Sequence, residues 1–418
     1  MAGAARIQPD FCYPPGLISV EAARAFLLER ARPLSDIETL ETGSTLGRVL
    51  AQAQSAAVDV PPYDNSAMDG YAVRAAEIAA AERTRLRVAQ RIAAGGHGVA
   101  LGAGEAARIF TGAPLPEGAD AVVMQEHCQA DGDAVWIPGP VAPGRHVRPR
   151  GNDIAAGTEV LAAGTRMRPQ EMGLAASVGL ARLPVTRRLR VAMFSSGNEL
   201  VAPGGPLAPG CIYNSNRYTL RGLLAALSCE TLDLGVVEDT LEATRGALQR
   251  AADAADLIVT SGGVSVGEED HLKEALAGVG RLELWQVAVK PGKPLAYGRV
   301  GDADFLGLPG NPVSTLVTFC LFVRPFILRR AGMIDVLPRP TLAAAAFEWP
   351  RPRDRREYVR ARVEPSADGA GVATLYPKQG SDVLSSAAWA QGLVEIPEGA
   401  TVQPGDPVMY YSFADMLY

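Results

Sequence analysis

Three short apolar runs in the second half of the chain each end in a turn rich in glycine and polar residues. Runs of four to six residues of this kind predict strands that are buried on both faces. The runs and the turns that follow them are 256–260 with 261–270, 284–289 with 290–294, and 305–308 with 309–314. In open α/β sheets, ligands bind at the carboxyl ends of parallel strands, where such turns gather. The pattern therefore predicts a binding site built from these three turns.

Strand and helix patterns alternate in the segment that precedes these turns. The strand patterns cover 190–194 and 231–237, and the helical patterns cover 217–227 and 241–254. Strands joined by helices of this length form parallel sheets with right-handed crossovers. Asn311 and Pro312 are typical of the first two positions of a helix, here one that runs to about residue 328. We therefore expect an α/β domain with a parallel sheet.

The flanking segments have other patterns. Short β-like runs alternate with Gly/Pro turns about every ten residues over 86–160, and β alternation returns over 339–418. These patterns predict a mostly β domain before the α/β segment and a small closing β domain after it. Ser19 is a suitable N-cap for a helix over 19–31. Apolar residues in 39–53 have helical and then strand-like spacing, which predicts either a helix or mixed structure.

Length and composition limit the classes of protein that this chain can be. At 418 residues it is too long for one ordinary core and predicts about three domains. A net charge of −6 argues against nucleic acid as the main partner, because binding to phosphate backbones needs a basic face. The longest apolar run, near 316–323, is far shorter than the ~20 residues that span a bilayer, and residues 1–15 contain no apolar leader segment. We expect a cytoplasmic protein with no membrane partner.

Cysteines and histidines are few and scattered. The five cysteines form no C-x-x-C pair, and the four histidines include no H-x-x-x-H pattern. Neither set matches the ligand spacing of a zinc site, and so few histidines also argue against a Ser-His-Asp triad. The cysteine pattern is typical of a reducing compartment.

Two lysines are the most distinctive cations of the chain. Only four of its 40 basic residues are lysine, and two of these, Lys290 and Lys293, stand three apart in the turn Lys-Pro-Gly-Lys-Pro. A compact ammonium among so many guanidinium groups suggests a function that needs a point charge, such as neutralising an oxyanion. The alternative is a solvated surface turn.

Three carboxylates follow predicted strands at the same edge of the sheet: Glu199, Asp239 and Asp270. Together with the lysines and the amide-rich turns, they suit a phosphate or other oxyanion with a hard cation such as Mg²⁺. Catalysis would then depend on positioning and charge stabilisation. Asp270 is also suitable as a helix N-cap, which does not exclude an anion site at the same helix end. The chain lacks G-x-x-x-x-G-K-[ST], so it is not a P-loop nucleotidase.

Two polar loops in the first half of the chain are further candidates. Residues 60–73 carry Asp64, Asn65 and Ser66 after two prolines, which predicts either a plain hairpin turn or a loop that presents polar side chains to a ligand. Three arginines crowd the loop at 145–150. They repel one another unless they are solvated or share an anion.

Five motifs, in this order along the chain, resemble those of the molybdopterin molybdenumtransferase family, which includes MoeA and the E domain of gephyrin. They are Asp64-Asn-Ser-Ala-Met-Asp-Gly-Tyr-Ala, Ile109-Phe-Thr-Gly-Ala-Pro-Leu-Pro, Ser261-Gly-Gly-Val-Ser-Val-Gly-Glu-Glu-Asp, Lys290-Pro-Gly-Lys-Pro and Gly307-Leu-Pro-Gly-Asn-Pro-Val-Ser. Their number and length make chance similarity a poor explanation.

The resemblance implies a multidomain fold and a homodimer. The expected parts are a helical and linker region (1–55 and 145–185), an inserted mostly β domain (56–144), a molybdopterin-binding α/β domain with a parallel sheet (186–332) and a C-terminal β barrel (333–418). It also implies a Mg²⁺-dependent reaction in which adenylylated molybdopterin and molybdate give AMP and molybdenum cofactor. The molybdopterin adenylyltransferase and the recipient molybdoenzymes would be further partners.

The resemblance also implies roles for individual residues. Asp64, Asp270, Lys290 and Lys293 would be catalytic, and Asp270 would bind the metal or the substrate phosphate together with Glu199 and Asp239. Asp64, Thr111 and Arg148 would face the α/β domain of the other subunit. The residues expected to contact molybdate or the pterin substrate are Ser66, Thr111, Arg148, Ser196, Gly262, Gly263, Ser265, Pro294, Asn311, Ser314, Arg360 and Ser386.

The chain departs from the family pattern in two places. Ser196-Gly-Asn-Glu199 stands where the family usually has Thr-Gly-Asp-Glu, so one carboxylate is missing there, and Pro149 interrupts a run that is often entirely charged. Two other functions remain open at this point. One is a pterin-binding or scaffolding protein without turnover, and the other is a general nucleotide phosphohydrolase.

Overall fold

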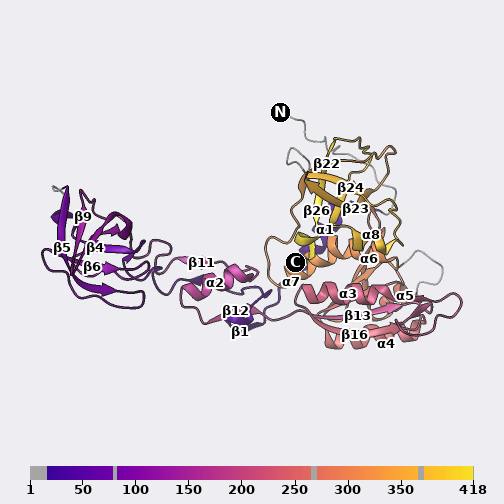
Figure 1. The fold of residues 1–418 in the computed structure, drawn as a ribbon. Coiled ribbons are helices and arrows are strands. Elements are labelled where there is room, and N and C mark those ends of the chain that lie inside the picture. The colour runs from indigo at the N-terminus through magenta and orange to yellow at the C-terminus, as the bar shows by residue number, and fades with distance from the viewer. Residues whose placement is uncertain (1–16, 79–81, 265–270, 366–370, 418) are drawn as a thin grey trace. The chain divides into compact units, whose positions relative to one another are not determined.

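The computed structural model describes residues 17–78, 82–264, 271–365 and 371–417, and its secondary structure is shown in Figure 1. It separates into two compact units. The larger unit comprises Met1–Glu38, Gly47–Ala51 and Val185–Tyr418, and the smaller comprises Thr39–Leu46 and Gln52–Pro184. The larger unit thus joins the α/β segment with the C-terminal β segment. The finer domain boundaries stay predictions.

A six-stranded sheet forms the centre of the larger unit, in the order β16-β13-β17-β21-β20-β18. The strands are β13 (Arg190–Ser196), β16 (Glu230–Val237), β17 (Leu257–Ser261), β18 (Gly280–Gln286), β20 (Pro294–Val300) and β21 (Ala303–Leu308). The first four in the sheet order are parallel, as the alternation of strands and helices predicts. β20 runs antiparallel to β21, because only Gly301 and Asp302 separate the two strands and so short a connection permits no crossover. β18 pairs antiparallel with β20 and therefore runs in the same direction as the first four strands.

Both faces of this sheet are buried, and alternate residues of each strand enter different cores. In β13, Val191 and Met193 pack into one core, whereas Ala192 and Phe194 pack into the other. Figure 1 shows α3 (Ser215–Ala226) and α4 (Leu241–Ala254) on opposite faces. This two-sided burial explains why the strands are apolar throughout.

The remaining helices of the unit complete the two layers. They are α1 (Val20–Arg30), α5 (His271–Val279), and one continuous helix made of α6 (Pro312–Thr318), a π-helical turn η4 (Phe319–Val323) and α7 (Arg324–Arg330). The Ser19 hydroxyl accepts a hydrogen bond from Ala22 N and caps α1, as predicted. The helix over 312–330 is long and apolar enough to cross a membrane, but 89% of its most apolar 18-residue stretch is buried inside the protein. It is the central helix of the larger core.

The C-terminal strands form a closed five-stranded barrel, in agreement with the prediction. The strands are β22 (Thr341–Ala345), β23 (Arg356–Pro365), β24 (Gly371–Leu375), β25 (Gly392–Ile396) and β26 (Pro407–Ser412), with α8 (Leu384–Trp389) before β25 and α9 (Phe413–Leu417) at the end. Pairing of β23 with both β24 and β25 closes the ring.

One short strand connects the barrel with the α/β sheet. β19 (Val289–Lys290) pairs with β23 of the barrel, and only three residues then lead to Pro294, where β20 of the α/β sheet begins. The turn that carries both distinctive lysines is therefore attached to both sheets.

The smaller unit contains a second six-stranded sheet, ordered β7-β4-β6-β5-β9-β8 and packed between two apolar cores. Its strands are β4 (Gly70–Val73), β5 (Arg83–Ile92), β6 (Glu105–Ile109), β7 (Ala121–Met124), β8 (Gln129–Asp131) and β9 (Ala134–Pro138). Two-stranded pairings join β3 (Asn65–Ser66) to β10 (Val147–Arg148) and β2 (Gln54–Ser55) to β11 (Glu159–Leu161). α2 (Pro169–Ser177) is the helix of this unit among its described residues.

Residues 39–53, for which helix or mixed structure was open, contain no α-helix. β1 (Ile37–Glu41) is followed by a single 3-10 turn (Thr42–Ser44), and Leu50 forms an isolated bridge with Val185. The apolar side chains of Val49 and Leu50 are buried as part of an extended segment.

Candidate active site

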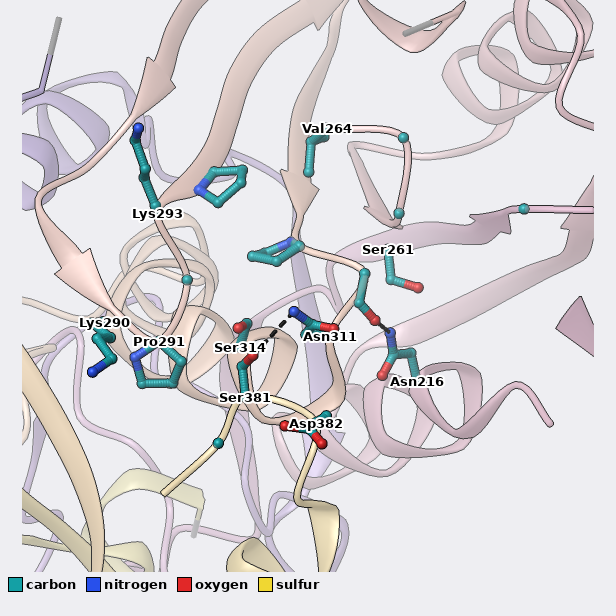
Figure 2. A pocket seen from close by; sticks show the side chains of 18 of the residues that line it. Asn216, Ser261, Val264, Lys290, Pro291, Lys293, Asn311, Ser314, Ser381 and Asp382 are labelled. Atoms are coloured by element: carbon teal, nitrogen blue, oxygen red, sulfur yellow. Dashed lines mark hydrogen bonds between the residues drawn. The ribbon is translucent and has the colours of Figure 1, made fainter. Parts of the chain in front are cut away.

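A cavity of about 1030 Å³ lies between the α/β sheet and the barrel, and Figure 2 shows part of its lining. The three glycine-rich turns meet there, as the sequence predicts for the carboxyl edge of the sheet. The cavity brings together ten of the predicted site residues: Ser196, Glu199, Asp239, Gly262, Gly263, Lys290, Lys293, Pro294, Asn311 and Ser314.

The lysine turn is fixed to the rest of the cavity wall by its backbone. Lys293 O accepts a hydrogen bond from Val287 N, and Gly292 lies against the long helix at Ser314 and Thr318. A Cβ on Gly292 would come within 2.3 Å of Thr318 Cγ2, and the φ of Gly292 is +112°. Only glycine fits this position, because both the space and the backbone conformation exclude other side chains. In Figure 2 the side chains of Lys290 and Lys293 extend in different directions from this turn.

The two described carboxylate candidates come from neighbouring strand ends. Ser196 lies at the end of β13, and its hydroxyl donates a hydrogen bond to Asp239 Oδ1 at 3.2 Å, just after β16. Asn198 Oδ1 accepts a hydrogen bond from Asp239 N, so it holds the same loop. Glu199 is exposed and lines the cavity close by. This edge of the cavity therefore presents two carboxylates.

The glycine turn after β17 lies against the end of β13. Gly262 has φ +87°, and a Cβ there would be 2.6 Å from Ser196 O. Ser261 Oγ is 3.1 Å from Ser195 Oγ on the adjacent strand. The absence of a side chain at Gly262 is thus what allows the two strand ends to approach.

The loop after β21 is joined to the barrel. Asn311 precedes α6, as predicted for an N-cap, but its side chain makes no capping bond. Instead Asn311 Nδ2 donates to Ser381 Oγ at 3.0 Å, and the dashed line in Figure 2 marks this bond. Ser314 is buried in the first turn of α6 and lines the cavity.

Arg360 and Ser386 do not line the cavity. Arg360, on β23, is only 1% exposed. Its Nε donates a hydrogen bond to Ser386 Oγ at 2.9 Å, and a terminal nitrogen donates one to Gly380 O at 2.9 Å. Burial lowers the pKa of Arg360 to about 10. Both residues therefore lie behind the loop 379–382, and that loop forms the cavity wall.

Four candidates gather in the smaller unit. Arg148 pairs with Asn65 in the β10–β3 ladder, beside Ser66, whose hydroxyl donates to Met68 O at 2.5 Å. Asp64 Oδ1 accepts a bond from Arg150 N at 2.7 Å. Thr111 is held by Asp69 Oδ1, which accepts bonds from the Thr111 backbone N and hydroxyl and thereby lowers the pKa of Asp69. The predicted loop candidates of the β domain thus form one polar cluster.

Asp270 and Ser265 lie outside the described residues. Five cavity residues were not predicted from the sequence: Ile212, Asn216, Trp349, Arg353 and Arg355. The arginines belong to the basic run Arg351-Pro-Arg-Asp-Arg-Arg356, which was a detectable signal. The polar segment 379–382 of the barrel also lines the cavity.

Comparison with known proteins agrees with this architecture along most of the chain. The model of the MoeA N-terminal region (domains I and II) matches residues 18–179, that of a probable molybdopterin binding domain matches 192–329, and that of the MoeA C-terminal region (domain IV) matches 343–413.

Individual relatives give the same result. A molybdopterin molybdenumtransferase from Haemophilus influenzae is 40% identical, with 79% of this chain and 82% of the relative aligned. Molybdopterin molybdenumtransferase 2 from Mycobacterium tuberculosis is 38% identical over 90% of this chain and 93% of its own. A molybdopterin biosynthesis MoeA protein from Pyrococcus horikoshii has a similar structure, with a TM-score of 0.76 at 32% identity and coverage of 95% of this chain and 99% of that one. The chain belongs to the MoeA family of molybdopterin molybdenumtransferases.

Proposed function

We propose that this protein is a molybdopterin molybdenumtransferase, which uses adenylylated molybdopterin and molybdate to form molybdenum cofactor and AMP. The observation that carries the proposal is the convergence of Lys290 and Lys293 with Glu199 and Asp239 in one cavity. Cations for an oxyanion and carboxylates for a hard metal ion are what cleavage of a phosphoanhydride beside molybdate requires.

The chain's own groups would act by binding and orientation. The ammonium groups of Lys290 and Lys293 would bind the anionic oxygens, and Ser314 in the first turn of α6 would add a hydroxyl donor. Gly262 and Gly263 would let the substrate approach the backbone closely. No histidine is among the described residues that line the cavity, and positioning and charge stabilisation would carry the chemistry.

Magnesium would bind at the carboxylate edge of the cavity. Glu199 and Asp239 present oxygen ligands, and Mg²⁺ is commonly held by one or two carboxylates together with substrate phosphates. Asp270 would be a further ligand from outside the described residues. The bound ion would neutralise the charge that develops on the leaving phosphate.

The polar cluster of the smaller unit suggests a second contribution. We propose a homodimer in which Asp64, Ser66, Thr111 and Arg148 of one subunit face the α/β domain of the other, as the family resemblance implies. Sedimentation velocity is expected to give a dimer. Four described cysteines are free thiols, which is consistent with a cytoplasmic protein.

The decisive assay follows AMP release from adenylylated molybdopterin and Mg²⁺, with and without molybdate. We expect AMP only when molybdate is present, and a loss of about a hundredfold in Lys293→Ala, by analogy with the loss of an oxyanion-binding donor. Lys273→Ala is the matched control, since Lys273 lies on α5 and does not line the cavity.

The alternatives give different results in the same assay. AMP release that is independent of molybdate would favour a general phosphohydrolase. Tight pterin binding without any AMP release would favour a binding or scaffolding protein.

A further inference from the structure

Glu357 is a buried carboxylate directly behind the lysine turn. It is 2% exposed, on the barrel strand β23, and it stands opposite Lys290 in the β19–β23 ladder. Its Oε2 lies 2.8 Å from Lys290 Nζ. The contact is therefore built into the register of the two strands, and it joins a residue of the barrel to a residue of the cavity wall.

The second oxygen of this carboxylate has no hydrogen-bond partner among the described residues. Oε1 is buried, and the nearest cation is Arg353, whose Nε is 3.6 Å away, longer than a hydrogen bond. A buried carboxylate is unfavourable unless it is paired. Because Oε1 contributes no hydrogen bond, the close ion pair with Lys290 is the main compensation for burying Glu357.

The second lysine of the turn has a different environment. No ion pair to Lys293 is found in the described part of the chain, and in Figure 2 its side chain extends away from Lys290. The two ammonium groups are thus unequal: Lys290 is held in place by a buried partner, whereas Lys293 can follow a ligand.

We propose that Glu357 is a positioning residue that fixes the Lys290 ammonium for oxyanion binding. An ammonium has three donors, so one can remain on Glu357 Oε2 while two are available to the ligand. An ordered donor loses less conformational entropy when it binds than a free lysine side chain does. This inference rests on the proposed function, because it assigns Lys290 to the anion site.

The direction in which anion affinity changes in Glu357→Gln tells whether Glu357 positions Lys290 or acts only through its charge. Glu357→Gln removes a negative charge 2.8 Å from Lys290. If Glu357 acted only through its charge, its loss would strengthen the binding of an anion. If it positions Lys290, its loss would weaken binding despite the more favourable charge balance.

We would measure molybdate binding by isothermal titration calorimetry and then the KM for molybdate in the AMP-release assay. Glu357→Gln is expected to raise both the dissociation constant and the KM by about tenfold, the size of a lost charge-assisted hydrogen bond. The matched control is Glu395→Gln, because Glu395 is also a barrel carboxylate but its partners are Arg356, Tyr358 and Tyr411. Unchanged or tighter molybdate binding by folded Glu357→Gln would overturn the proposal.

A second test uses NMR of the wild-type protein, so it depends neither on enzymatic activity nor on whether a Glu357 variant folds. The chain has only four lysines, so ¹⁵N-lysine NMR of the wild-type ammonium groups is simple, with assignment by Lys290→Arg and Lys293→Arg. An ammonium held in an ion pair exchanges its protons more slowly, so we expect a sharp signal from Lys290 and a weaker one from Lys293. Equal signals would overturn the positioning role. A sharp Lys290 signal in a protein that binds no molybdate would instead contradict the proposed function alone.

Discussion

The side chain of Asn311, in the loop after β21, donates a hydrogen bond to the Ser381 hydroxyl, in the loop before α8, at 3.0 Å. This bond joins the α/β domain to the barrel, and both residues line the cavity. A backbone bond from Val313 N to Ser381 O runs parallel to it and remains when either side chain is changed. The side-chain bond can therefore be tested without separating the two loops.

Ser381→Ala is expected to raise the KM of the pterin substrate about fivefold with little change in thermal stability. The reason is that a single exposed hydrogen bond contributes about 1 kcal/mol, and its loss lets the cavity wall move. Steady-state kinetics would measure this, with Ser385→Ala as control because that hydroxyl contacts Tyr376 instead. The double variant Asn311→Ala/Ser381→Ala should raise the KM no more than one single variant does, because both substitutions remove the same hydrogen bond. If the two effects on the KM instead add in full, the two residues act separately.

Ser386→Ala is expected to lower the free energy of unfolding by about 1–3 kcal/mol, because it leaves the Nε of a buried guanidinium without a partner. Urea unfolding would measure the loss, and Ser386→Thr, which keeps the hydroxyl, should restore part of it. Arg360 also holds Gly380 in the cavity wall, so activity should fall together with stability. A loss of molybdate affinity at unchanged stability would instead indicate that Ser386 contacts the anion directly.

Asp256 is expected to make the larger unit sensitive to acid. Burial alone would raise the pKa of Asp256, but hydrogen bonds from Arg187 and Arg190 outweigh it and hold the pKa well below its usual range. Because the folded pKa is depressed, this stabilisation is present above the unfolded pKa of about 4 and is lost as the pH falls through that value toward the folded pKa.

Asp256→Asn should therefore lower the free energy of unfolding at pH 7 by about 2–4 kcal/mol. It should also reduce the loss of stability between pH 6 and pH 3 relative to wild type. Urea titrations at both pH values would measure the two effects. An identical pH dependence in the variant would contradict the assignment.

Gly262→Ala is expected to cost about 1–3 kcal/mol and most of the activity. Alanine is strained in the left-handed backbone conformation of this position, and its Cβ would be 2.6 Å from Ser196 O. The ends of β13 and β17 must therefore separate. Gly222→Ala is the control. Gly222 is inside α3 with no atom within 4 Å of an added Cβ, so alanine there should stabilise the helix by about 1 kcal/mol.

The sequence predicted those parts of the molecule in which local pattern and burial agree. The helix predicted over 241–254 is α4 with the same bounds, and the three glycine-rich turns meet at one cavity as expected. The antiparallel edge of the sheet was missed, because a buried apolar strand looks alike in either direction. Strand direction there is decided by the two-residue connection between β20 and β21.

In the candidate site, too, some residues could be predicted from local sequence and others could not. Lys290 and Lys293 were found because their residue type and spacing are unusual. Glu357 was missed, because a single glutamate in an arginine-rich strand has no local signal, and only the pairing of β19 with β23 places it behind Lys290. Arg360 and Ser386 were expected to touch the ligand, but tertiary packing places them behind the loop that lines the cavity.

The double attachment of the lysine turn has a mechanical consequence. Three residues between β19 and β20 span at most about 14 Å, so a tilt of the barrel against the α/β sheet must displace the lysine turn. An anion bound by both ammonium groups would resist that tilt. If a bound pterin changes the tilt, it changes the affinity for the anion, and the anion then changes the affinity for the pterin by the same factor. The order in which the two substrates arrive would then alter how tightly the second one binds, without any direct contact between them.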